Sequence, residues 1–245
     1  MLLDIVFMTF YFIPFKFVLR RAGVKKCVIF SGKAPLNGYA YFTGEIGKKK
    51  VFIKFDTKYH LINNDVLAYK KCKNKLDKYL VKIIAFKNTG KIRYVIYEFF
   101  ESTTLNNNNI LENPQLISDI YKVISGINSL RLIHRDIKLD NFLIKNNKLK
   151  IIDLTLMASL DDSNKFKSFN INNKNEKKTL HTLNKKYSPP GLVWNDFYSL
   201  QLILKEVLRN KNNCVEEKTK IYIDDWIIKI EKDVKNNSYK LPINP

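Results

Sequence analysis

Short hydrophobic runs separated by turn-forming residues dominate the first hundred residues of the chain. The runs CVIF, YAYF and VFIKF lie within residues 27–55, and the segments SGKAPLNG and TGEIGKKK separate them. Val, Ile, Phe and Tyr favour strands, whereas Gly, Asn and Pro favour turns. We therefore predict antiparallel strands within residues 27–55. Two more strands are predicted over residues 79–86 and 92–99.

A polar stretch, residues 63–78, interrupts these runs and predicts a helix. Asn63 or Asn64 is a suitable N-cap, since an Asn side chain accepts a hydrogen bond from the first free N–H groups. A turn-like segment, STTLNNNN, begins at Ser102 and marks the end of the strand pattern.

Helical periodicity follows this turn. Apolar residues recur every three or four positions from Leu116 to Leu130, which predicts a helix with one buried face. Asn113 and Pro114 place a proline in its first turn. The other predicted elements are strands over 141–145 and 149–152, joined by an Asn146-Asn147 turn, a lysine-rich mobile loop over 159–186, and helices over 196–209 and 218–234.

This change of pattern predicts an α+β fold with two lobes. The predicted segments are an apolar and basic N-terminal segment (1–26), a small β-rich N-lobe with one helix (27–100), and a mainly helical C-lobe (101–245). The C-lobe is expected to be truncated, because only 49 residues follow Asp196.

The chain carries 43 Lys and Arg against 23 Asp and Glu, a formal charge of +20. Lysine supplies most of this excess, and no compact arginine-rich patch is present, so nucleic-acid binding is not expected. Cys27, Cys72 and Cys214 are far apart, which argues against a disulfide framework and a zinc site. A reducing, cytoplasmic compartment is the simplest expectation.

The first 18 residues are strongly apolar, and Arg20, Arg21, Lys25 and Lys26 follow them. Asp4, Pro14 and Lys16 interrupt this run, which is short for a transmembrane helix of about 20 apolar residues. It also lacks the pattern of a signal peptide. Two interpretations remain: the segment packs on the first lobe, or it contacts a membrane peripherally.

The most informative stretch is HRDIKLDN, residues 134–141, followed by a second acid at the end of a strand, Asp153. Asn141 and Asp153 offer oxygen ligands suited to Mg²⁺. Asp136 offers a further carboxylate that can orient a hydroxyl, and Lys138 a cation that can face a phosphate.

These residues resemble the catalytic machinery of the protein kinase family, and HRDIKLDN is similar to its HRDLKxxN loop. The resemblance implies that Asp136 accepts the proton of the attacking hydroxyl and that Lys138 contacts the transferred phosphoryl group. It further implies that Asn141 and Asp153 bind Mg²⁺ and that ATP is the phosphate donor.

The resemblance extends into the predicted N-lobe. Lys54 in VFIK is similar to the lysine of the VAIK motif, which binds the ATP phosphates. Asp65 is the expected partner of Lys54, because no Glu lies between Lys54 and Glu98. The resemblance also implies that Gly38 belongs to the nucleotide-binding loop, and that Glu98 and Phe100 belong to the hinge that binds adenine.

Three motifs depart from the family pattern. The glycine-rich loop is reduced to KAPLNG at residues 33–38, DFG becomes DLT at 153–155, and Pro190 replaces the Glu of the APE motif. Because the residues for phosphate transfer remain, we expect an active enzyme.

The leading expectation is an ATP- and Mg²⁺-dependent kinase acting on Ser/Thr hydroxyls of proteins, since Lys138 resembles the Ser/Thr-type loop. One alternative is a small-molecule kinase of the same superfamily, such as one that acts on lipopolysaccharide core sugars. The other alternative is a pseudokinase that scaffolds a partner. Expected partners are ATP and the acceptor; a peripheral membrane contact stays open.

Overall fold

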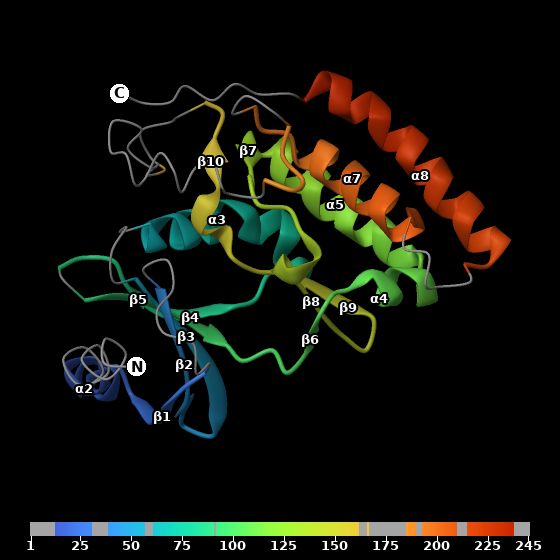
Figure 1. Ribbon diagram of the computed structural model, residues 1–245. Helices are drawn as coiled ribbons and strands as arrows, with labels where there is room; N and C mark the ends of the chain where they lie inside the picture. The colour runs from blue at the N-terminus through green and yellow to red at the C-terminus, as the bar shows by residue number, and fades with distance from the viewer. Residues whose placement is uncertain are drawn as a thin grey trace. The chain divides into compact units, whose positions relative to one another are not determined.

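The computed structural model describes residues 13–30, 39–56, 61–90, 92–161, 166, 185–189, 193–209 and 215–237. Two compact units divide the chain: Met1–Val66 with Val81–Phe100, and Leu67–Leu80 with Glu101–Pro245. Unit 1 contains an antiparallel sheet, and unit 2 contains most of the helices (Figure 1). The predicted α+β fold is confirmed.

Unit 1 is built on one antiparallel sheet with the strand order β1-β2-β3-β5-β4. Its strands are β1 (Val24–Ile29), β2 (Tyr39–Ile46), β3 (Lys49–Asp56), β4 (Ile83–Lys87) and β5 (Arg93–Glu98). The segment TGEIGKKK, predicted as a turn, is mostly strand: β2 and β3 pair from Tyr39 and Asp56 down to Ile46 and Lys49. Gly47 takes the left-handed conformation (φ +61°) that this tight turn requires.

A short helix, α2 (Ile13–Arg21), packs against one face of this sheet (Figure 1). Phe15 and Leu19 are fully buried in the same cluster as Phe42 and Phe55. The rings of Phe15 and Phe55 stack with centroids 4.1 Å apart. Because side chains alternate along a strand, Lys54 lies on the opposite face of β3 from Phe55.

The N-terminal part of the chain was expected either to pack on the first lobe or to contact a membrane. For residues 13–21 packing is observed, since α2 belongs to the core of unit 1. No helix in the described part of the chain is long and apolar enough to span a bilayer.

Gly44 in β2 lies where β1 comes close, beside the irregularity in the β1–β2 pairing between Lys25 and Val28. A Cβ on Gly44 would lie 2.6 Å from Val24 Cγ1 and 3.0 Å from the carbonyl oxygen of Lys25. The backbone oxygen cannot move without disturbing the strand.

We therefore expect Gly44→Ala to lower the free energy of unfolding by about 1–3 kcal/mol, the usual cost of overpacking. Denaturant unfolding of the two proteins measures this difference. Equal midpoints would show that β1 adjusts freely and that the close approach is not needed.

The helix predicted over residues 63–78 is present as α3 (Ile62–Leu76), but its predicted cap is wrong. The helix begins at Ile62, whose N–H donates to Asp56 Oδ2 at 3.1 Å, so an acid at the end of β3 holds the first turn. Asn64 lies inside the helix and is buried. The strand predicted from Tyr79 begins later, because Asp77–Tyr79 form a 3₁₀ turn.

A helix was missed in unit 2. The segment STTLNNNN, predicted as a turn, contains β6 (Thr103–Thr104) and the start of α4 (Asn107–Glu112). The Asn106 side chain accepts from the N–H of Asn109 at 3.1 Å, and the Asn109 side chain accepts from the N–H of Asn106 at 3.0 Å. Two asparagines thus form a capping box, in which Glu or Gln more often takes the second place.

The longer helices of unit 2 follow the predicted periodicity. Helix α5 (Gln115–Ser129) buries one face, with Pro114 as its N-cap rather than in its first turn. Helices α7 (Asp196–Arg209) and α8 (Glu217–Asn236) lie side by side (Figure 1).

Two small antiparallel sheets complete unit 2, with the orders β6-β8-β9 and β10-β7. Their remaining elements are β7 (Leu132–Ile133), the 3₁₀ turn η4 (Leu139–Asn141), β8 (Phe142–Lys145), β9 (Lys148–Ile151), the 3₁₀ turn η5 (Leu154–Leu156) and β10 (Ala158–Ser159). The strands predicted over 141–145 and 149–152 are confirmed. Most of the predicted loop over 159–186 lies outside the described residues.

Candidate active site

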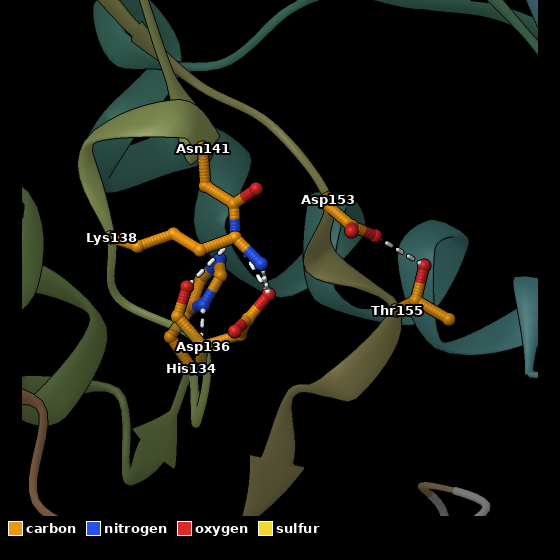
Figure 2. A network of polar contacts seen from close by, with 6 residues as sticks. All are labelled: His134, Asp136, Lys138, Asn141, Asp153 and Thr155. Atoms are coloured by element: carbon orange, nitrogen blue, oxygen red, sulfur yellow. Dashed lines mark hydrogen bonds and ion pairs between the residues drawn. The ribbon is translucent and has the colours of Figure 1, made fainter. Parts of the chain in front are cut away.

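The segment HRDIKLDN forms the connection from β7 through η4 to β8 in unit 2. Its two ends are held in place by short strands. Ile133 pairs with Ala158, and Phe142 pairs with Ile151. These pairings place residues 134–141 next to the segment that contains Asp153, as Figure 2 shows.

Asp136 is at the centre of this segment and is only 2% exposed. Its Oδ2 accepts from Lys138 Nζ at 2.7 Å and from Asn141 Nδ2 at 2.9 Å. Its Oδ1 is buried and has no hydrogen-bond partner among the described residues. A buried carboxylate oxygen without a partner costs free energy, so this atom is available for a hydrogen donor that the described residues do not supply.

The orientation of the Asn141 amide follows from its contacts. Nδ2 donates to both the main-chain oxygen of Asp136 (2.7 Å) and Asp136 Oδ2 (2.9 Å). Two acceptors on that side identify the nitrogen. The amide oxygen therefore points away from Asp136 (Figure 2), where it can bind a cation.

Asp196, the first residue of α7, fixes the start of residues 134–141, the candidate catalytic segment. Its Oδ2 accepts from the N–H of His134 at 2.6 Å, and its Oδ1 accepts from the N–H of Arg135 at 3.0 Å. Burial raises the pKa of Asp196, while nearby His134 and the two backbone N–H donors oppose that rise. Asp196 thus supports the start of the catalytic segment from helix α7.

The sequence predicted no role for Arg135 within the HRDIKLDN motif, but the structure shows a structural role for this side chain. Its Nε donates to the carbonyl oxygen of Leu156 at 2.5 Å, and its guanidinium lies 5.5 Å from the ring centre of Trp194. Burial lowers the pKa of Arg135 to about 10, while the charge of Asp196 opposes this shift, so Arg135 stays charged at neutral pH. Arg135 thus links the catalytic segment to the residues after Asp153.

Arg135 and Asp153 share an unusual backbone conformation. Both are non-glycine residues with positive φ, +70° and +59°. Such conformations cost roughly 1–3 kcal/mol each and tend to occur at functional sites. The backbone beside Asp136 and at Asp153 is therefore held by its surroundings in a conformation that non-glycine residues rarely adopt.

Asp153 has a contact that the sequence did not predict. Thr155, in the position of the glycine of DFG, donates from Oγ1 to Asp153 Oδ1 at 2.8 Å (Figure 2). A carboxylate offers about four acceptor positions. The Thr155 hydroxyl therefore takes one of the acceptor positions that a cation bound by Asp153 would use.

Replacing Thr155 by Val should remove this hydrogen bond with little change in volume. We expect the apparent affinity for Mg²⁺ to increase about 3- to 10-fold, because a hydrogen bond of roughly 0.5–1.5 kcal/mol no longer competes for the carboxylate. Titration of ATP-dependent activity with Mg²⁺ measures this change. A weaker affinity in the variant would show instead that Thr155 chiefly orients Asp153.

Unit 1 contains the predicted pair of Lys54 and Asp65. Lys54 Nζ lies 3.1 Å from Asp65 Oδ2, and the two residues are 4% and 1% exposed. The expected ion pair therefore forms, although Asp is one methylene shorter than Glu. Lys54 Nζ also lies 4.9 Å from the ring centre of Tyr39.

The other residues predicted to contact the nucleotide are Glu98, Phe100 and Gly38. The N–H of Glu98 donates to the carbonyl oxygen of Lys82 at 2.9 Å, so this group holds the strand end within the sheet. The adenine-binding roles of Glu98 and Phe100 stay predictions. Gly38 lies outside the described residues.

A cavity of about 670 Å³ adjoins the catalytic segment within unit 2. It is lined by Leu105, Asn106, Asn107, Asn108, Lys138, Leu139, Asp140, Lys185, Lys186 and Tyr187. Lys138 contacts both this cavity and the Asp136 carboxylate. The cavity is therefore a candidate site for the acceptor.

The described residues contain no group of three or more His, Cys, Asp and Glu side chains that could hold a metal ion alone. Asn141 and Asp153 supply two hard oxygen ligands. Such a pair suits Mg²⁺, which keeps water and phosphate oxygens in its other positions. The donor set therefore fits Mg²⁺ bound together with nucleotide phosphates.

Comparison with known proteins agrees with this geometry. The protein kinase domain family matches residues 46–243. The cysteine-rich receptor-like protein kinase 41 of Arabidopsis thaliana is 27% identical over 168 residues, covering 61% of this chain and 25% of the relative. The cell cycle protein kinase DBF2 of Candida albicans (strain SC5314 / ATCC MYA-2876) is 31% identical over 137 residues, covering 52% of this chain and 18% of the relative.

This chain thus spans a quarter or less of the length of these two relatives. The family match, in contrast, includes Lys54, Asp65, Asp136, Asn141 and Asp153 and leaves out the reduced glycine loop. Since it covers most of the 245 residues, the chain belongs to the protein kinase family.

Proposed function

We propose that this protein is an ATP- and Mg²⁺-dependent kinase that phosphorylates Ser or Thr hydroxyls of proteins. The observation that carries the proposal is the environment of Asp136. One oxygen of its carboxylate is held by Lys138 and Asn141, and the other is buried without a partner in the described structure. This second oxygen can accept a hydrogen bond from the hydroxyl group of an acceptor.

Asp136 acts on the acceptor hydroxyl in this proposal. Its Oδ1 accepts the proton while the hydroxyl oxygen forms a bond to the γ-phosphorus. The bond from the γ-phosphorus to the β,γ-bridging oxygen breaks, and ADP leaves with that oxygen. Lys138, 2.7 Å from Asp136 Oδ2, fixes the carboxylate and places a positive charge beside the transferred group.

Asn141 and Asp153 would hold Mg²⁺ through their oxygens, and Lys54 would bind the α- and β-phosphates. Mg²⁺ when bound offsets the charge of the phosphates and of the transition state. Asp65 holds Lys54 in position through their 3.1 Å ion pair. The contribution of these residues is electrostatic and positional, as expected for phosphate transfer.

Lys138 supports the choice of Ser/Thr acceptors, since it lies two residues after Asp136 as in the Ser/Thr-type loop. The cavity beside Lys138 supports an acceptor on this side of the catalytic segment. A scaffolding pseudokinase is the second candidate, favoured by the Thr155 hydroxyl that occupies part of Asp153.

The acceptor is identified by incubating the purified protein with γ-labelled ATP and Mg²⁺. Generic protein substrates and a lipopolysaccharide or sugar extract are offered separately, and labelled protein is hydrolysed to identify the phosphorylated amino acid. We expect label on Ser or Thr. Label on Tyr, or in glycolipid alone, would overturn the acceptor assignment, and ATP binding without transfer to any acceptor would favour the pseudokinase.

A further inference from the structure

The outward surface of α2 combines exposed apolar and basic side chains. Phe15 and Leu19 are buried in unit 1, while Ile13 and Phe17 on the other side of the helix are 52% and 61% exposed. In a helix, residues four apart lie on one face. Ile13 and Phe17 therefore form an apolar pair that the described part of unit 1 leaves exposed.

Exposed basic side chains follow this pair along the chain. Arg20 and Arg21, in the last turn of α2, are exposed, as are Lys25 and Lys26 at the start of β1. Lys26 pairs with Glu45 at 3.0 Å. Residues 5–44 contain no Asp or Glu in the sequence, so the positive charge of this surface has few local acids to balance it.

We propose that this surface, formed by Ile13, Phe17, Arg20 and Arg21, binds the headgroup region of an anionic membrane. A bulky apolar pair beside arginines is the composition of helices that lie in a lipid interface, where the apolar side chains enter the acyl boundary and the cations meet the phosphates. The surface is complementary to negative charge.

The sequence before α2 strengthens the choice of a lipid surface over a soluble partner. Ten of the twelve residues 1–12 are hydrophobic, and they lead directly into Ile13. Stable attachment to a membrane commonly requires two signals, an apolar insertion and a basic patch. Both occur within the first 26 residues of this chain.

Binding through this surface is compatible with a working Lys54. Helix α2 packs on the face of the sheet that bears Phe55, and Lys54 lies on the other face with Asp65. Because Phe15 and Leu19 anchor α2 in the core, the helix need not leave unit 1 to contact lipid. The inference does not rest on the proposed function.

Vesicle sedimentation tests the inference with the whole 245-residue chain. The vesicles contain phosphatidylcholine alone or phosphatidylcholine with about one third phosphatidylserine, because anionic lipid attracts exposed basic residues. We expect the parent to bind only the anionic vesicles, and binding to weaken when salt is raised from about 0.1 M to about 0.5 M.

Two paired variants assign the surface, Ile13→Ser with Phe17→Ser and Arg20→Ser with Arg21→Ser. Each should reduce anionic vesicle binding about tenfold or more. The matched control is Ile221→Ser with Ile228→Ser on α8, whose side chains are 54% and 62% exposed. This control should bind vesicles as the parent does, and thermal unfolding checks that every variant folds.

Several results would overturn the inference. These are failure of the parent to bind anionic vesicles, equal binding to neutral vesicles, or full binding by both α2 variants. Binding retained by the α2 variants but lost when residues 1–12 are deleted would assign the contact to that segment instead. An equal loss in the α8 control would show that apolar exposure in general, rather than α2, drives binding.

Discussion

Phosphate transfer should fall by about 10²- to 10⁴-fold when Asp136 is replaced by Asn, the range expected for loss of a general base. The amide has the same shape and can still accept from Lys138 and Asn141, which now hold Asp136 Oδ2. It cannot take a proton from the acceptor hydroxyl. The loss should therefore appear in kcat, while nucleotide binding and the unfolding midpoint stay near those of the parent.

A matched control lies on α8. Asp224 is exposed, and Asp224→Asn makes the same chemical change away from residues 134–141 and from the cavity beside them. The Asp224 variant should retain kcat within about threefold, since surface changes of this kind have small effects. A similar loss in both variants would point to a general effect of lost negative charge rather than to a base at Asp136.

Replacing Asp196 by Ala should lower the free energy of unfolding by about 3–5 kcal/mol. The change removes the acceptor of two buried N–H groups, those of His134 and Arg135. It also leaves the buried charge of Arg135 without its carboxylate neighbour, a loss with costs of this size. Urea unfolding monitored by circular dichroism measures the difference.

The control for this prediction is Asp225→Ala on the exposed side of α8. It should change the free energy of unfolding by less than about 0.5 kcal/mol. If Asp196→Ala were equally mild, water or a rearranged side chain would have to satisfy both N–H groups. The proposed support of the catalytic segment by α7 would then be wrong.

The elements that could be predicted are those with a strong local pattern. Leu116 to Leu130 repeat with a helical period, and α5 buries that face. The runs YAYF and VFIKF form β2 and β3 because their residues favour a pleated sheet. Local composition determines these elements, so one sequence suffices.

The wrong or missed predictions occur where the structure depends on contacts between distant residues or on unusual local contacts. The start of α3 is set by Asp56, an acid on the preceding strand, rather than by the asparagines nearest the helix. Helix α4 was missed because its start lies in a run of asparagines, which favour turns. Here the side chains of Asn106 and Asn109 accept from each other's backbone N–H and cap the helix. Helix α2 was not predicted, and its stability comes from packing of Phe15 and Leu19 on the sheet.

The candidate site was predictable in its residues but only partly in its contacts. The resemblance calls for a helix acid beside Lys54, and the lack of a Glu between Lys54 and Glu98 led to Asp65; the ion pair forms. The Thr155–Asp153 hydrogen bond could have been anticipated, because a hydroxyl two residues from a carboxylate is a common local donor. The role of Arg135 could not have been anticipated, because Leu156 and Trp194 are distant in the sequence and contact Arg135 only in the folded chain.

Transfer of labelled γ-phosphate by the purified protein tests the central claim most directly. Parent and Asp136→Asn are compared at saturating ATP and Mg²⁺, with ATP binding verified for both by the shift of the unfolding temperature. The account predicts Mg²⁺-dependent transfer by the parent, at least about 10²-fold faster than by the variant. Equal rates in the two proteins, with ATP bound to both, would contradict it.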